Sequence, residues 1–194
     1  EREKREKFVN LGLASVSEIL RNYVEDLDQL SDKVIEKLVS YMKANQGGLF
    51  IMEEDTEGNP VISLKACRAY DRKKFFDKHI QLGEGLIGQI ALEKETLVMT
   101  EIPDGYLSIT SGLGIANPTC LIIVPLKSNE EVVGLIEMAS FKEFTTTDVE
   151  FLEKVGESIA STILSAKTNQ QTKELLEGSR QMTEELHAQE EEMR

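Results

Sequence analysis

Residues 119–141, TCLIIVPLKSNEEVVGLIEMASF, contain two apolar runs that are separated by a short polar turn. The runs, 119–126 and 132–141, are apolar nearly throughout, which is typical of strands in the centre of a sheet. Residues 128–130 supply the turn. A connection this short joins antiparallel strands, because parallel strands need a long crossover. The stretch therefore predicts the antiparallel centre of a sheet.

A second antiparallel hairpin is predicted upstream of these strands. The apolar run 49–52 and the alternating segment 61–70 flank turn-forming residues at 57–60. A short strand at 97–99 and a helix-like composition at 85–95 complete the middle of the chain. We therefore expect an α+β fold, with a central antiparallel sheet of five to six strands flanked by helices.

Two helices are predicted before the sheet. Residues 1–26 form an amphipathic helix that Gly12 weakens locally, and Asp28 or Ser31 is a candidate cap for the second helix. The apolar face of the first helix consists of Phe8, Leu11, Ser15, Ile19 and Tyr23.

The longest predicted helix runs from residue 148 to residue 194, roughly 70 Å at 1.5 Å per residue. A capping box formed by Thr147 and Glu150 begins it. Its distal part repeats residues in alternating steps of four and three, which is typical of a coiled-coil seam rather than of a simple amphipathic helix. The seam consists of Leu175, Ser179, Met182, Leu186, Gln189 and Met193. Ser179 and Gln189 are expected to weaken the dimer and to fix its register.

The composition limits the partners. The chain has 194 residues, with 35 acidic and 22 basic side chains and a formal net charge of −13. This charge argues against nucleic acid as a partner and against direct membrane contact. No run approaches the roughly 20 apolar residues of a membrane helix. We expect a cytoplasmic piece of a longer protein.

A dinucleotide-binding motif and a metal or nucleophilic site are both rejected. Residues 83–88, GEGLIG, match the glycine pattern of a dinucleotide-binding loop, but that loop needs a parallel βαβ unit. We expect these glycines to turn the chain into a helix instead. The two histidines, His79 and His187, lie on different elements. Cys67 and Cys120 are interpreted as core thiols, with redox sensing as an alternative if they lie on adjacent strands.

The segment 103–118 is the most informative for function. It is small and uncharged over 109–118, ITSGLGIANP, and such residues let backbone amides approach a ligand. We expect a lid that packs on the sheet. The residues leave two alternatives open: a ligand lies beneath the lid, or the lid closes directly on the sheet.

The order of these pieces resembles the GAF domain over about residues 27–164. The resemblance is carried by 83–88 leading into a short helix, by CLIIVPL at 120–126, by EVVGLIE at 131–137, and by FTTTD at 144–148. It implies a PAS-related sheet with a pocket beneath the lid. It also implies long N- and C-terminal helices that pack in a parallel homodimer.

Further motifs resemble the GAF modules of bacterial hybrid sensor histidine kinases, which lie between a HAMP-like segment and PAS and kinase parts. They are NQGGLF at 45–50, YDRKK at 70–74, SGLG at 111–114 with Asn117 and Pro118, and EELHAQEEEM at 184–193. Cyclic-nucleotide-binding relatives have an Asn-Lys pair where Ser140 and Phe141 stand here. Bilin-binding relatives have a pocket cysteine, often beside a histidine, and relatives that reduce free methionine sulfoxide have several loop cysteines.

We therefore expect a non-enzymatic sensor or relay module of a two-component protein whose parent is membrane-anchored. Its parts are a signalling helix (1–26), a GAF domain (27–164) and a coiled-coil linker (165–194). No cofactor or metal is expected, although an unknown small molecule fits the lid. Alternatives are a ligand-free dimerisation spacer and, remotely, an enzyme resembling free methionine sulfoxide reductases. The expected ligand-binding residues are Tyr70, Tyr106, Ile109, Thr110, Ser111, Gly112, Leu113, Asn117 and Cys120, and the expected dimer residues are Leu175, Met182, Leu186 and Met193.

Overall fold

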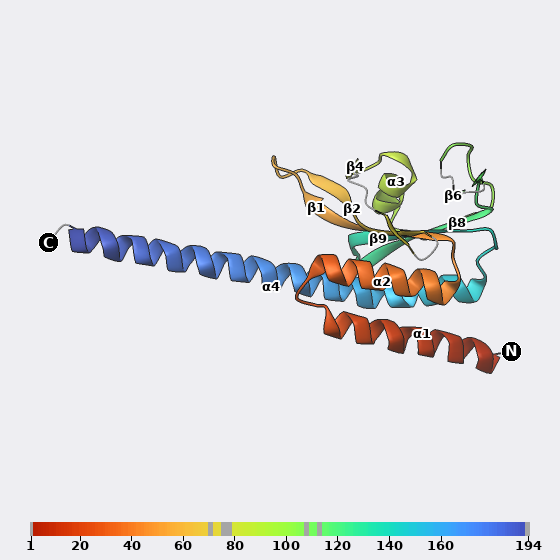
Figure 1. Ribbon diagram of the computed structural model, residues 1–194, viewed down its shortest axis with the longest axis horizontal. Coiled ribbons are helices and arrows are strands. Elements are labelled where there is room, and N and C mark those ends of the chain that lie inside the picture. Colours follow the sequence, from red (N-terminus) through yellow and green to blue (C-terminus); the bar gives the residue numbers. More distant parts are fainter. Residues whose placement is uncertain (1, 70–71, 75–78, 107–108, 112–113, 193–194) are drawn as a thin grey trace.

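The computed structural model describes residues 2–69, 72–74, 79–106, 109–111 and 114–192 (Figure 1). The helices in these residues are α1 (Arg2–Asn22), α2 (Leu27–Met42), α3 (Gly85–Glu93) and α4 (Thr146–Glu192). The strands are β1 (Gln46–Glu54), β2 (Pro60–Ala69), β3 (Arg72–Lys74), β4 (His79–Gln81), β5 (Leu97–Met99), β6 (Ile109–Ser111), β7 (Gly114–Ala116), β8 (Cys120–Ser128) and β9 (Glu131–Ser140). The predicted α+β class is confirmed.

The described strands form one antiparallel sheet in the order β3-β2-β1-β9-β8-β5, with β4 also paired to β2. Strand β3 pairs with the end of β2 and β4 with its beginning, so the two share one edge. Seven described strands thus fill six positions, against the five to six that the sequence predicts. Strands β6 and β7 form a separate hairpin.

The β8–β9 hairpin occupies the centre of the sheet, as residues 119–141 predict. Its two turn residues, Asn129 and Glu130, have φ values of 49° and 64°. Two consecutive left-handed residues form the type I′ turn, whose twist matches that of the strands it joins. The Nζ atom of Lys94, just after α3, donates to the carbonyl of Glu130 at 3.0 Å.

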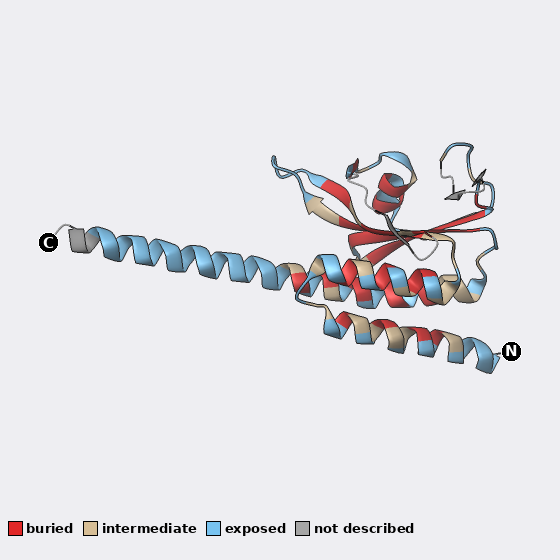
Figure 2. Ribbon diagram, in the orientation of Figure 1, coloured by how far each residue is buried: buried red, intermediate tan, exposed pale blue. Residues whose placement is uncertain are grey.

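The sheet is covered differently on its two faces (Figure 1). Helices α2 and α4 lie against one face with α1 outside them, whereas α3 and the β6–β7 hairpin lie over the other. Because side chains alternate along a strand, β8 directs Ile122 toward the α4 layer and Leu121 toward the α3 layer. Figure 2 shows that burial on α4 is confined to the part beside the sheet.

Helix α1 packs on the domain through a face that the sequence predicts in part, since Phe8, Ile19 and Tyr23 lie partly buried against the core. The buried residues are Val9, Gly12, Val16 and Leu20, whereas Leu11 is 55% exposed. The reason is Gly12, which was expected only to weaken the helix. A Cβ atom there would lie 2.4 Å from the Phe151 ring and 2.7 Å from the Tyr41 ring. The glycine therefore lets α1 approach α2 and α4 closely.

Three aromatic rings join α1, α2 and α4 beside this glycine. The Phe8 ring stacks on Tyr41 with centroids 4.8 Å apart, and Phe151 lies 5.6 Å and 5.2 Å from them respectively. The Tyr41 hydroxyl donates to the Phe8 carbonyl at 2.5 Å. Aromatic pairs of this kind add about 0.5–1.5 kcal/mol each beyond their buried area. The cluster fixes α1 to the domain near its N-terminal end.

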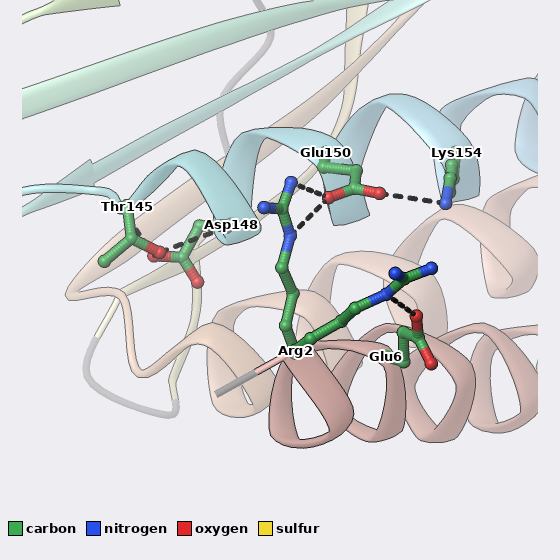
Figure 3. A network of polar contacts seen from close by, with 7 residues as sticks. Arg2, Glu6, Thr145, Asp148, Glu150 and Lys154 are labelled. Atoms are coloured by element: carbon green, nitrogen blue, oxygen red, sulfur yellow. Dashed lines mark hydrogen bonds and ion pairs between the residues drawn. The ribbon is translucent and has the colours of Figure 1, made fainter.

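Ionic contacts continue the junction between α1 and α4 (Figure 3). Arg5 donates to Glu150 through Nε at 2.8 Å, and Lys154 donates to the other oxygen of the same carboxylate at 3.0 Å. Within α1, Arg2 pairs with Glu6 at 2.9 Å. The groups are largely exposed, so these contacts orient the helices more than they stabilise them.

The predicted helix caps differ from the true ones, the nearest candidates, Asp28 and Thr147, each lying two residues too far along the chain. Helix α2 is capped by Asp26, whose side chain accepts from the Gln29 amide at 3.0 Å. At the start of α4, Thr145 Oγ1 accepts from the Asp148 amide at 3.2 Å, and Asp148 Oδ2 accepts from the Thr145 amide at 2.7 Å. The capping box predicted at Thr147 and Glu150 is therefore wrong.

Helix α4 leaves the domain at a defined point. Its inner half is buried through Phe151, Leu152, Val155, Ile159 and Ile163, and its last buried residue is Ala166 at 8% exposure. The adjacent Lys167 donates to the backbone carbonyl of Met52 at the end of β1. Burial lowers the pKa of this lysine, and nearby Glu53 opposes that change. Beyond this anchor the helix is exposed as far as Gln189.

Candidate functional site

The face of the sheet turned toward α3 carries a second apolar layer, separate from the one beneath α2 and α4. Its edge toward the predicted lid is formed by partly buried side chains that include Met99, Ile102 and Tyr106. The buried members of the layer are Phe50, Ile62, Ile80, Ile87, Ile90, Ala91, Leu121, Ile123, Leu135 and Ala139.

The glycine motif at 83–88 has a structural role, as the sequence predicts. Gly83 and Gly85 have φ values of 80° and 61°, which favour glycine over other residues. The Gly83 amide donates to the Gly88 carbonyl at 3.0 Å, and a Cβ atom on Gly88 would lie 2.5 Å from the Gln81 carbonyl oxygen. The motif turns the chain tightly from β4 into α3. Because β4 is antiparallel to β2, no parallel βαβ unit surrounds it.

The predicted lid is described in part. Tyr106 ends a turn in which its amide donates to the Pro103 carbonyl at 3.1 Å. Residues Ile109, Thr110 and Ser111 form β6, which pairs with β7. Asn117 is exposed beyond that hairpin. Three other predicted ligand-binding residues lie outside the described residues: Tyr70, Gly112 and Leu113.

Tyr106 contacts the sheet through a hydrogen bond to a carboxylate. Its hydroxyl donates to Oε1 of Glu137 at 2.6 Å. Burial raises the pKa of Tyr106 far above its ordinary value of 10.0, and the Glu137 charge raises it further. The phenol therefore stays protonated and holds the start of the lid on strand β9. Sequence reasoning missed Glu137, although it is the only charged residue in the run 132–139.

The two cysteines lie on different strands and different faces. Cys67 is in β2 and Cys120 in β8, with β1 and β9 between them. Three strand spacings amount to roughly 14 Å, whereas a disulfide needs Cα atoms within about 7 Å. The alternative of adjacent cysteines is therefore wrong. Alternation places Cys120 with Ile122 on the α4 side, so it does not line the surface that Tyr106 covers.

Replacing Tyr106 with phenylalanine is expected to lower the free energy of unfolding by about 1–2 kcal/mol, because Glu137 loses a donor. Since the folded pKa of Tyr106 is raised, its contribution is complete below pH 10.0 and falls as the pH rises further. Urea unfolding at neutral and alkaline pH measures both effects. Tyr23→Phe is the control, because the Tyr23 hydroxyl makes no hydrogen bond to any described residue. Equal midpoints for Tyr106→Phe and the unaltered chain would contradict the prediction.

The described residues contain neither a metal-binding cluster nor a membrane-spanning helix. No group of three or more His, Cys, Asp or Glu side chains is arranged to hold a metal ion there. None of the helices in those ranges has the length and apolar character needed to cross a membrane.

Comparisons with known proteins agree on the fold. Solved structures with a similar fold include the GAF domain of an Acinetobacter phosphoenolpyruvate-protein phosphotransferase, with 16% identity, a TM-score of 0.63, and coverage of 82% of this chain and 96% of that one. A free methionine-R-sulfoxide reductase from Neisseria meningitidis, solved with its substrate, has 17% identity and a TM-score of 0.64, with coverage of 83% and 91%. A GAF domain from A. aeolicus in an inactive state has 22% identity and a TM-score of 0.56, with coverage of 79% and 96%.

A comparison with curated proteins finds no match. A model of the GAF domain family matches residues 24–164, which include the whole sheet and the inner half of α4. By this match and by its fold, the chain belongs to the GAF domain family.

Proposed function

We propose that this chain is a small-molecule-sensing or signal-relay module of a cytoplasmic part of a bacterial two-component sensor, and that it is not itself an enzyme. The observation that carries the proposal is the continuity of α4. One helix packs against the sheet with its inner half and extends into solvent with its outer half. A change in how α4 packs against the sheet therefore also moves its distal end, because both belong to one rigid helix.

The two faces of the sheet are linked through β9. Glu137, which accepts from Tyr106, is directly followed by Met138 and preceded by Ile136, and both of these apolar side chains belong to the layer beneath α4. A displacement of Glu137 by a ligand thus acts on side chains that contact the helix layer. We propose that ligand binding shifts the population between two packings of the lid and of α1 on α4.

We propose that the outer half of α4 forms a parallel dimer with a second copy. Leu175, Met182 and Leu186 are 76%, 66% and 57% exposed, which leaves an apolar stripe uncovered in one chain. The fourth predicted dimer residue, Met193, lies outside the described residues. Continuing the heptad steps toward the domain gives only small hydroxyl residues, namely Thr172, Thr168, Ser165, Ser161 and Ser158. Small side chains in a seam permit close approach of the two helices.

The groove between α1 and α4 supports the same arrangement. It has a volume of about 450 Å³ and its lining includes Ser17 of α1 with Ser158 and Ser161 of α4. In this proposal the seam reaches the domain, where α1 lies beside α4. In this proposal a HAMP-like segment precedes α1, and PAS and kinase parts of a membrane-anchored parent follow α4. The support for that context is the resemblance of the sequence motifs and the acidic charge of the chain.

Two observations support this proposal over its alternatives, a reductase and a ligand-free spacer. A reductase that uses a disulfide needs two thiols that can meet, and Cys67 and Cys120 are separated by two strands. A spacer without a ligand needs no polar group on the sheet face under the lid, whereas Glu137 lies there and accepts from the lid residue Tyr106.

The test combines ligand detection with a readout on the distal helix. Native mass spectrometry of residues 1–194 should show a dimer with a co-purifying small molecule, or thermal shifts should identify a stabilising compound in a metabolite panel. A nitroxide at Lys173→Cys then reports the distance between the two copies of α4 by pulsed electron resonance. A ligand that changes this distance supports the relay. A dimer with no ligand and an unchanged distance would establish the spacer instead.

A further inference from the structure

The two edges of the sheet differ in the residues that they offer to a further strand. At one edge, β3 has the sequence Arg-Lys-Lys, and charged residues on an edge strand hinder pairing with another chain. At the opposite edge, β5 has the sequence Leu-Val-Met and carries no charged residue. The outer side of β5 forms no backbone hydrogen bond with any described residue. The β5 edge is therefore open to strand addition.

Val98 at this edge has an uncovered apolar side chain. It pairs with Ile122, which is buried in the layer beneath α4, and residues directly opposite each other on neighbouring strands share a face. Val98 is nevertheless 41% exposed, because no described strand lies beyond β5. Leu97 and Met99 point to the other face, where they are partly buried against the α3 layer. A further strand beside β5 would cover all three side chains.

A cleft on the α4 side of the sheet begins at the residue before β5. It has a volume of about 420 Å³, within the range of ligand pockets, and lies between α4 and the connection from α3 to β5. Glu95, Glu153 and Glu157 line it, together with Lys94 and Lys127. None of the three carboxylates forms an ion pair with a described residue, whereas Lys94 already donates to a backbone carbonyl in the β8–β9 turn. The cleft therefore presents an excess of negative charge beside the open edge.

From these observations we infer that the β5 edge and the adjoining cleft form a docking surface for an extended peptide segment of a partner protein, in which lysine or arginine alternates with apolar residues. The segment adds a strand to β5 through backbone hydrogen bonds. Its side chains alternate between the two faces of the sheet. The basic side chains cover Val98 with their aliphatic parts and place their charges in the cleft. The apolar side chains contact Leu97 and Met99.

The charge of the chain favours a basic segment over an acidic one, because a net charge of −13 attracts cations at long range. The inference goes beyond the proposed sensor function, since it concerns a protein partner at the sheet edge and not a small molecule under the lid. Glu153 and Glu157 lie on either side of Gly156, where a Cβ atom would lie 3.3 Å from the Leu126 side chain. A bound segment would therefore contact α4 where this helix packs closely on β8.

The probe for this surface is a fluorescein-labelled, end-capped heptapeptide of alternating valine and lysine. Its anisotropy on titration with residues 1–194 should show binding at least about tenfold tighter than that of the same peptide with glutamate in place of lysine. Two further peptides are N-methylated on all valines or on all lysines. One of them should bind at least about tenfold more weakly than the parent peptide, because alternate amides of an added strand face β5.

Val98→Lys gives β5 a charge like those of β3, and it should weaken the valine-lysine peptide at least about tenfold. Leu92→Lys is the matched control, because Leu92 is 57% exposed on α3, outside the strand edge, and gains the same charge. It should leave the affinity unchanged. Circular dichroism checks that both variants retain the fold of the unaltered chain.

The double variant Glu95→Gln with Glu153→Gln tests the cleft and should also weaken the peptide at least about tenfold. Glu157 is left in place because it also lines the groove between α1 and α4. The control for the lost charge is Glu18→Gln with Glu25→Gln, two exposed residues outside the cleft. This control should bind the peptide as the unaltered chain does.

Four results would each overturn the inference: no binding of the valine-lysine peptide, equal binding of both N-methylated peptides and the parent, unchanged affinity in Val98→Lys or in the double variant, or an equal loss in Leu92→Lys. Amide NMR shifts confined to the outer half of α4 would overturn it as well, because they would place the peptide on the exposed acidic helix. The sensor proposal is decided separately, by the co-purifying ligand and by the distance between the labels on α4.

Discussion

Leu175→Lys is expected to convert the dimer of this chain into a monomer, whereas Leu176→Lys leaves it dimeric. The two leucines are adjacent on α4 and are 76% and 73% exposed, so in a single chain the two substitutions should have similar effects. Only Leu175 lies in the proposed seam with Met182 and Leu186. A lysine there places two like charges in an apolar interface, which should raise the dimer dissociation constant at least about 100-fold.

Sedimentation equilibrium over a range of concentrations measures this difference directly. The unaltered chain and Leu176→Lys should follow the same dimer curve, and Leu175→Lys should have the mass of a monomer. Circular dichroism checks that helix content in the domain is retained. If Leu176→Lys dissociates the dimer and Leu175→Lys does not, the seam lies on another stripe of α4. If neither does, the outer half of α4 does not hold the dimer.

Gly12→Ala is expected to destabilise the domain by about 1–3 kcal/mol, although alanine is the better helix former. The added methyl group would lie 2.4 Å from the ring of Phe151 and 2.7 Å from that of Tyr41. These rings are packed against each other and against Phe8, so they have little room to move. Helix α1 must therefore shift away from α4. Gly12→Leu should separate it further and make α1 sensitive to limited proteolysis.

Gly178→Ala is the matched control for this substitution. Gly178 is also within a helix, but no atom apart from its chain neighbours and its own helix backbone lies within 4 Å of the position of its Cβ atom. Alanine there should stabilise the helix by up to about 1 kcal/mol. Urea unfolding followed by circular dichroism compares the two variants. A gain in stability for both would show that α1 does not pack on Phe151 as described.

The sequence predicts the sheet better than the surfaces of its helices. The hairpin at 119–141 is unambiguous because both strands are buried on two faces and only a short turn joins them. The buried face of α1 is harder to predict. Gly12 has no hydrophobic side chain, so the sequence pattern indicates only that it weakens the helix. Its close approach to Phe151 depends on a residue far away in the sequence. The helix caps were displaced because Asp and Thr recur within two residues of the true caps, Asp26 and Thr145.

The candidate site was predicted in part. Tyr106 was expected as a residue of the lid, and its hydroxyl bonds to the sheet. Glu137 was not expected, because a single acidic residue in a strand does not reveal which face it occupies until the register is known. The register also places Cys120 on the opposite face. A shift of one residue in the register of a strand moves each of its side chains to the other face of the sheet. Predicting which residues line a site therefore depends on the register more than on the composition.

The anchor of α4 at Lys167 has a mechanical consequence. From this residue to Glu192 the helix projects as a lever arm of roughly 39 Å, at 1.5 Å per residue. A tilt of about 5° at the pivot would move the far end of such an arm by about 3 Å, more than the sub-ångström shifts that accompany many binding events. Lys167 donates to the carbonyl of Met52, so the positions of the end of β1 and of the β1–β2 hairpin determine the resting direction of the outer helix. If two copies of the outer half of α4 pair along the proposed seam, they cannot tilt by different amounts. The movement that remains is a twist that both helices share.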